Sequence, residues 1–357
     1  MNDECPRCRE YAARGDLFCG ACGKYLSTVR PGSSENVVAE KRSGDPAKNF
    51  LSIILQVACV FVLIIAVIEL IALFVNSGDV FLFLEDKYLN FFLIIPFPTA
   101  VFSMSGVALQ AYWLLLILVI FVCVVTVVLR FFRDTKSGGG IAQPGSAEKS
   151  PAFWVTVFIS AMLLINFIIV ILTEAAGSSV EVPDFGEQVE QVFLFANAAV
   201  WEEIITRMLY IGVPMTILSL IMTKKADSLK CLLGGFGMSK VAVLLIIISG
   251  AIFGLAHYPG WEDQVWKVIA SGIMGMFLGY LFVRFGLYAS ILLHFITNYL
   301  SAFDWLGMDG VGIIVSVMLL FLGGFALLYI ILRLFGSGGE MKGLPLFRNG
   351  HIKGDRS

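Results

Sequence analysis

Charged residues are scarce in this sequence, and their scarcity excludes most soluble folds. Asp, Glu, Lys and Arg make up 15% of the 357 residues, whereas 58% are hydrophobic. A soluble domain of this length would carry roughly a quarter charged residues. The charges are clustered between long apolar runs, a pattern typical of a bundle of membrane spans. Apart from a small N-terminal module, no segment is basic enough to suggest nucleic acid, and we expect no nucleic-acid partner.

The sequence also lacks the signs of a secreted protein. The first apolar run begins near residue 50, behind 49 polar residues, so we expect a membrane anchor and not a cleaved signal peptide. Seven cysteines are present, of which four form two pairs near the N-terminus. The other three, Cys59, Cys123 and Cys231, lie singly in or beside apolar runs. We expect them to be packing residues and not a disulfide framework.

Eight apolar runs are near or above the roughly 20 residues that a helix needs to cross about 30 Å of hydrocarbon. They occupy 50–76, 107–132, 153–176, 190–222, 240–257, 264–284, 286–303 and 310–335. The predicted fold class is an all-α polytopic membrane protein with about eight transmembrane helices. A further apolar patch at 91–102 contains Pro96 and Pro98. We expect it to be interfacial or re-entrant, because two prolines in three residues break a helix.

The loops between these runs alternate in charge. Loops 77–106, 173–189, 258–263 and 304–309 are mainly acidic, whereas Lys and Arg gather in the segments 1–49, 133–152, 223–240, in the turn 284–286 with Arg284, and from Arg333 onward. The positive-inside rule then places both termini in the cytoplasm and predicts an even number of spans. We therefore expect an integral, multi-pass protein of the lipid bilayer, in a prokaryotic plasma membrane.

Two cysteine pairs near the N-terminus predict a structural zinc site. Cys5-Pro-Arg-Cys8 and Cys19-Gly-Ala-Cys22 are separated by ten residues and supply four thiolates for a tetrahedral zinc ion. Four ligands leave no open position for chemistry, and a module of this size needs the metal to fold. The segment resembles the zinc ribbons at the N-termini of many prokaryotic membrane proteins. Loose thiols or redox pairs are the alternative, and the ribbon's cytosolic partner is unknown.

Three charged residues lie inside the fourth apolar run. Glu202, Glu203 and Arg207 begin about 12 residues after its outer end. Insertion scales put the cost of burying Arg or Asp there at about 2.5–3.5 kcal/mol each. The i, i+4 spacing lets Glu203 and Arg207 pair on one helix face. Glu202 points about 100° away, so it needs a partner from another helix.

Few polar partners are available for Glu202. Of the three histidines, His351 lies in the tail. His257 ends the fifth run, and His294 lies inside the seventh with Asn298 one helical turn later. One Glu and two His match the ligand count of a catalytic zinc site completed by water. Without metal, they suit a Glu general base with His and Asn donors for an oxyanion. Spacing leaves both mechanisms open, together with a structural role in helix association.

Three short motifs on successive apolar runs resemble those of a known family. They are Glu202-Glu203-x-x-x-Arg207, Phe253-x-x-x-His257 and His294-x-x-x-Asn298. In this order they are similar to the motifs of the CPBP family, which comprises the CAAX prenyl proteases (Rce1-like) and the bacteriocin-processing intramembrane proteases, also called the Abi family. The resemblance covers roughly residues 150–305 and implies an endopeptidase active site within the membrane.

The resemblance also implies roles for the motif residues. Glu202 would activate water with the help of His257, and His294 with Asn298 would bind the oxyanion. Family members are often described as metalloproteases, which makes Glu202, His257 and His294 candidate ligands of an active-site zinc. A metal-free glutamate mechanism has also been argued for the family, and this sequence leaves the choice open.

By the same resemblance, Glu203 and Arg207 would position the helix. The loop charges bear on the substrate, because they place His257 near the outer end of its run and the site open to the extracytoplasmic side or the membrane core. Prenylated CAAX tails are cytosolic, so we expect a membrane-associated peptide or protein substrate.

The alternatives are a CAAX-type prenyl protease acting on C-terminal tails, a non-catalytic scaffold or regulator working through the zinc ribbon, and a proton-carrying transporter. A transporter should show related halves or paired broken helices, and the sequence shows neither.

These observations divide the chain into six segments. They are a zinc ribbon at 1–27, a polar linker at 28–49, two N-terminal spans with a linker at 50–149, a catalytic helix core at 150–305, a last span at 306–335 and a polar cytoplasmic tail at 336–357. In the core, Gly272, Gly275 and Gly279 have the small-residue spacing that favours close helix contact.

Overall fold

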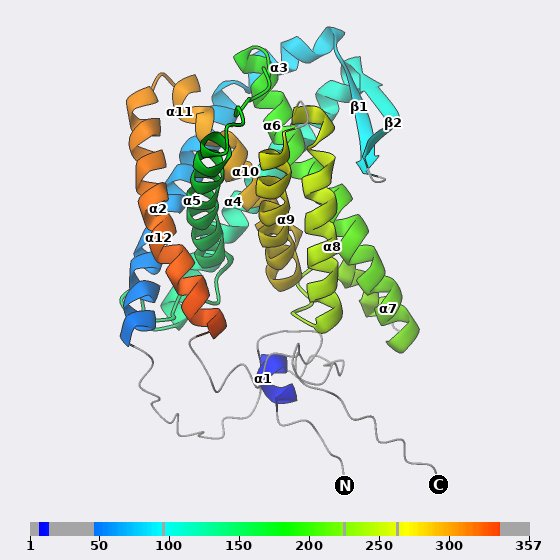
Figure 1. Cartoon of the computed structure of the whole chain (residues 1–357). Helices are drawn as coiled ribbons and strands as arrows, with labels where there is room; N and C mark the ends of the chain where they lie inside the picture. Colours follow the sequence, from blue (N-terminus) through cyan, green and yellow to red (C-terminus); the bar gives the residue numbers. More distant parts are fainter. Residues whose placement is uncertain (1–6, 14–45, 95–96, 224–225, 262–263, 336–357) are drawn as a thin grey trace.

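A computed structural model describes residues 7–13, 46–94, 97–223, 226–261 and 264–335. Its main body is a helical bundle with a two-stranded hairpin at one side (Figure 1). Within these ranges, six helical segments are long and apolar enough to cross a membrane. They are α2 (Pro46–Val75), α4 (Gly106–Ser137), α5 (Pro151–Ala175), the continuous segment Gln188–Met222, α9 (Val265–Phe285) and most of α12 (Asp309–Phe335). The chain is an integral, multi-pass membrane protein, as predicted.

Two of the eight predicted spans form shorter helices. α8 (Lys240–Ala256) has 17 residues and α10 (Leu287–Asn298) has 12, so the described residues hold six long spans and not eight. α10 need not cross the bilayer alone, because residues 289–296 are all buried by neighbouring helices. The 3-10 turn η5 (Tyr299–Ser301) and α11 (Ala302–Trp305) continue the chain after α10 towards the end of the bundle at which the hairpin lies (Figure 1).

The two ends of the bundle carry different loops. The start of α2 and the end of α12 lie at one end, and the hairpin with α3 (Ser77–Phe83) lies at the other (Figure 1). The basic loop after α4 belongs to the first end, because its Glu148 accepts hydrogen bonds from Ser52 at 3.1 Å and from Arg333 at 2.9 Å. This contact joins α2, the loop and α12.

The same contact makes part of the fold sensitive to acid. Burial raises the pKa of Glu148, but hydrogen bonds from Tyr329, Arg333 and Ser52 and the charge of Arg333 outweigh it and hold the pKa below its usual value. A lowered carboxyl pKa stabilises the fold above the ordinary carboxyl pKa, and this contribution is lost as the pH falls.

The apolar patch at 91–102 forms a β-hairpin. β1 (Tyr88–Ile94) pairs antiparallel with β2 (Pro98–Ser105). Pro98 is the first residue of β2, a position at which the missing backbone N–H is tolerated. As predicted, this proline-containing segment is not an α-helix, and its aromatic and aliphatic residues favour strands.

Two side chains attach the hairpin to the segment Gln188–Met222. Trp201 Nε1 donates a hydrogen bond to the carbonyl of Phe92 at 3.0 Å. The Tyr210 hydroxyl donates to the carbonyl of Ile94. Because backbone groups at membrane depth need partners, these bonds fix β1 beside the helical segment that carries Glu202 and Glu203.

Helices α8 and α9 approach each other through glycines. A Cβ added at Gly254 of α8 would lie 2.5 Å from the carbonyl oxygen of Val268 and 3.0 Å from the Cα of Gly272. A Cβ added at Gly275 of α9 would lie 2.9 Å from the Cα of Gly250. The predicted close contact of the glycine-bearing helix is confirmed, and its partner glycines lie on α8.

Replacing Gly254 with alanine should force α8 and α9 apart and displace His257, three residues later. We expect overpacking to cost about 1–3 kcal/mol, seen as a lower thermal midpoint of the detergent-solubilised protein. Gly272→Ala is the matched control, because its Cβ would meet no atom closer than 3.6 Å. Equal midpoints for the two variants would contradict the close contact.

Candidate active site

Glu203 and Arg207 form the ion pair that their spacing predicts. Arg207 Nε donates to Glu203 Oε2 at 3.2 Å, and both side chains are 0% exposed. Arg207 Nη1 also donates to Ser249 Oγ of α8 at 2.6 Å. The guanidinium lies over the ring of Phe253, 5.0 Å from its centre. The pair therefore connects α6 (Gln188–Glu203) and the residues after it to α8.

Glu203 has a second partner, His294 of α10. His294 Nδ1 lies 3.0 Å from Glu203 Oε1. Because an ionised carboxylate only accepts hydrogen bonds, Nδ1 carries the proton and donates. The other nitrogen, Nε2, lies 3.8 Å from Glu202 Oε2. Glu203 thus orients the imidazole, and Glu202 faces its opposite nitrogen.

The two adjacent glutamates have different surroundings. The side chain of Glu203 is fully buried, whereas that of Glu202 is 19% exposed and lines a cavity. Described residues supply no hydrogen bond to the Glu202 carboxylate, and His294 is its ion-pair neighbour. Glu202 is therefore the carboxylate that water or a substrate can reach.

His257 lines the same cavity from the end of α8. Its Nδ1 lies 2.8 Å from the carbonyl oxygen of Phe253, so Nδ1 donates and Nε2 remains an acceptor. The ring of Phe253 packs edge-on against both imidazoles, with centroid distances of 4.7 Å to His257 and 5.8 Å to His294. Phe253 therefore spaces the two histidines, a role that the sequence did not reveal.

Asn298 lies one turn after His294, and both line the cavity, as their spacing predicts. The Nδ2 group of Asn298 donates to the carbonyl of Phe195 at 3.4 Å. An amide nitrogen has two hydrogens, so one donor of Asn298 is left for a substrate oxygen.

A change in helix geometry follows the two glutamates. α6 ends at Glu203 and continues as a π-helical segment, η2 (Ile204–Gly212), before α7 (Val213–Thr223). Segments of π-helix are rare and are frequent at functional sites. Arg207 lies inside η2, and nothing in the residue spacing indicated this irregularity.

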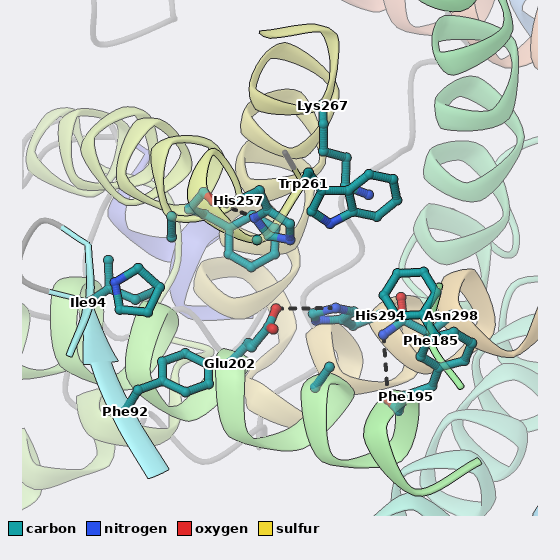
Figure 2. A pocket seen from close by; sticks show the side chains of 15 residues that line it. Phe92, Ile94, Phe185, Phe195, Glu202, His257, Trp261, Lys267, His294 and Asn298 are labelled. Carbon is teal, nitrogen blue, oxygen red and sulfur yellow. Dashed lines mark hydrogen bonds and ion pairs between the residues drawn. The ribbon is translucent and has the colours of Figure 1, made fainter. Parts of the chain in front are cut away.

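The cavity in front of Glu202 has a volume of about 240 Å³, which is room for several water molecules. Figure 2 shows Glu202, His257, His294 and Asn298 around it. Much of the remaining wall comes from regions that sequence reasoning missed, namely the hairpin, the segments that precede α6 and α9, and the first turn of α9. These residues are Phe92, Ile94, Pro98, Phe185, Trp261 and Lys267.

The candidate metal ligands Glu202, His257 and His294 all line this cavity. Both histidines hold Nδ1 in a hydrogen bond, which is how ligating histidines are commonly oriented. In the described ranges, however, no three His, Cys, Asp or Glu side chains are close enough together to hold a metal ion. The present arrangement of these three side chains therefore does not fit a three-ligand metal site.

The four cysteines of the predicted zinc ribbon fall mostly outside the described residues. Cys5, Cys19 and Cys22 lie outside them, and Cys8 begins the short helix α1 (Cys8–Ala13). The structural zinc site stays a prediction.

Comparison with known families assigns the central part of the chain. Residues 188–300 match the model of the family described as Type II CAAX prenyl endopeptidase Rce1-like. The match begins at the first residue of α6 and ends just after α10, so it contains all three motifs. No curated protein and no solved structure matches the chain. Residues 188–300 are therefore an Rce1-like type II CAAX prenyl endopeptidase (CPBP) family domain.

Proposed function

We propose that the protein is an intramembrane endopeptidase that hydrolyses a peptide bond of a membrane-associated peptide or protein. The family domain implies endopeptidase activity on a protein or peptide substrate. The observation that carries the proposal is the pairing of Glu202 with His294 Nε2 at 3.8 Å beside a cavity, with Glu203 holding Nδ1 at 3.0 Å. A reachable carboxylate and an oriented imidazole are the groups that hydrolysis by activated water requires.

In the first step, the Glu202 carboxylate takes a proton from a water molecule in the cavity. The water oxygen attacks the carbonyl carbon of the scissile bond, and the carbonyl oxygen becomes a tetrahedral oxyanion. His257 Nε2 accepts a hydrogen bond from the second hydrogen, which stays on the water oxygen, and so orients the attack. This role needs an acceptor at Nε2, which the bond from Nδ1 to Phe253 provides.

In the second step, the oxyanion is stabilised and the amine leaves. Asn298 Nδ2 donates to the oxyanion, and His294 Nε2 donates when it also carries a proton. The negative charge of Glu203 stabilises that imidazolium, and Arg207 keeps Glu203 in place. Glu202 returns its proton to the nitrogen as the carbon–nitrogen bond breaks, which restores the carboxylate.

A CAAX-type prenyl protease is the second candidate, and the description of the matched family favours it. The aromatic wall of the cavity suits a lipid group as well as apolar side chains. The position of the cavity supports the first candidate. Its wall includes the hairpin, at the end of the bundle opposite the basic loop after α4 (Figure 1), which the positive-inside rule makes the extracytoplasmic end.

The test is hydrolysis by the purified, full-length protein of membrane-anchored peptides and of matched prenylated peptides, with products identified by mass spectrometry. We expect internal cleavage of the unprenylated peptides. Faster cleavage of the prenylated set would favour the second candidate. No cleavage of either set, also by native membranes, would favour a scaffold that works through the zinc ribbon.

Repeating the cleavage assay with a metal chelator separates a metal-dependent mechanism from a metal-free glutamate mechanism. Undiminished cleavage in the chelator would support the glutamate mechanism, and loss that zinc restores would assign a metal to the reaction. The same assay on a Cys19→Ser, Cys22→Ser double variant distinguishes an active-site metal from zinc in the ribbon.

A further inference from the structure

Lys267 is a charged group of the cavity that the proposed hydrolysis does not use. It lies in the first turn of α9 and lines the cavity with Glu202 and His257 (Figure 2). Among the described residues of the cavity wall it is the one lysine or arginine. We propose that Lys267 binds a carboxylate of the substrate, so that the enzyme selects peptides with a negative charge near the scissile bond. This inference rests on the proposed endopeptidase function and names its substrate class.

The ammonium group is held beside the cavity by an aromatic ring. Lys267 Nζ lies 3.7 Å from the ring centre of Trp261. Trp261 is in turn packed edge-on against Trp266 at 5.6 Å and against Phe185 at 5.8 Å. A ring face attracts the cation but does not satisfy three N–H donors. No described residue accepts a hydrogen bond from these donors, so they are open to an acceptor that enters the cavity.

Described residues offer this ammonium no ion pair. None of the ion pairs between described side chains includes Lys267. Glu202 is near enough to Lys267 for the two charges to attract, but the side chains form no ion pair. Among the described residues the ammonium therefore has no close counter-ion, and leaving such a charge at the edge of an apolar wall is costly. A bound anion would remove that cost.

Helix stability does not explain a lysine at this position. The first turn of a helix is its positive end, where cations are unfavourable. The first turn of α9 contains no acidic residue that would offset the charge. Function at the cavity is therefore the better explanation of Lys267.

The chemistry of peptides identifies the anion as a carboxylate. A carboxylate near the scissile bond would be repelled by Glu202, and the ammonium of Lys267 supplies the charge that offsets this repulsion. The carboxylate has two sources, the side chain of an acidic residue or the free C-terminus of the peptide. Both place the same group in the cavity, so the experiment must separate them.

The test compares three peptides with one cleavage sequence. One has a free C-terminal carboxylate near the scissile bond, the second has an amidated end, and the third is amidated but carries a glutamate side chain there. We expect the wild type to prefer one or both carboxylate peptides, and Lys267→Gln to raise KM for them about tenfold and abolish the preference. Lys267→Arg should keep it. Lys136→Gln, an exposed lysine of α4, is the charge-matched control.

Two results would overturn the inference. Equal KM values of the three peptides with the wild type would show that no carboxylate is recognised. An equal fall in kcat for all three in Lys267→Gln would show that Lys267 acts on Glu202 and not on the substrate.

A binding measurement separates this inference from the proposed hydrolysis. The three labelled peptides are titrated by fluorescence anisotropy onto protein that carries Glu202→Gln, with and without Lys267→Gln. Tighter binding of a carboxylate peptide, lost with Lys267→Gln, would support recognition even if no peptide were cleaved. Equal binding of all three would contradict recognition even if the wild type cleaved them.

Discussion

Glu202→Gln should lower kcat by a factor of about 10²–10⁴, the usual contribution of a general base. Glutamine keeps the size and polarity of the side chain but cannot take a proton from water. Because no described residue donates a hydrogen bond to this carboxylate, the substitution removes little that holds the fold. We therefore expect KM and the thermal midpoint to stay near those of the wild type. The values of kcat and KM are measured on the peptide that the wild type cleaves fastest, and the thermal midpoint is measured on the detergent-solubilised protein.

The matched control is Glu187→Gln. Glu187 is exposed and precedes α6 without making a side-chain cap hydrogen bond, so its variant should keep wild-type activity. Cleavage by Glu202→Gln at the wild-type rate would show that the general-base assignment is wrong. A fall in activity together with a fall in the thermal midpoint would instead indicate that Glu202 supports the fold.

The parts of the site that depend on helical spacing could be predicted from the sequence. Glu203 and Arg207 pair because i and i+4 share a helix face. His294 and Asn298 line one cavity for the same reason. Leaving a carboxylate without a partner in the bilayer is costly. The sequence therefore predicted that Glu202 would lie beside a polar residue, such as a histidine, of another helix.

The rest of the cavity wall could not be predicted, because it depends on contacts between distant segments. The hairpin reaches the site through Trp201 and Tyr210, which donate to the carbonyls of Phe92 and Ile94. Spacing within one segment cannot show such contacts. The aromatic and aliphatic residues of 88–94, followed by Pro96 and Pro98, were a signal for two strands.

Helix length was overestimated for a related reason. A hydropathy pattern shows that 286–303 is apolar but not what surrounds it. In the structure, α10 ends at Asn298. Other helices cover residues 289–296, so the segment need not span the hydrocarbon by itself. The short helix brings His294 and Asn298 to the interior of the bundle.

Breaking the Glu203–Arg207 pair from either side should destabilise the protein by about 3–5 kcal/mol, because one buried charge is left without its partner. Arg207→Met removes the arginine partner of the Glu203 carboxylate and leaves its contact with His294, whereas Glu203→Gln leaves a buried guanidinium without its carboxylate. The double variant should cost clearly less than the sum of the two single ones. Equilibrium unfolding of the four proteins in mixed micelles measures this coupling.

Activity separates the structural role of this pair from its role at the site. Glu203 also holds His294 Nδ1 at 3.0 Å, and the glutamine of the double variant cannot supply the negative charge that stabilises the imidazolium. We therefore expect the double variant to regain stability relative to the single variants but to remain poorly active. Additive costs of the two substitutions would show that Arg207 acts through Ser249 and Phe253 instead. Recovery of activity along with stability would show that the pair only holds the helices together and that His294 does not need Glu203.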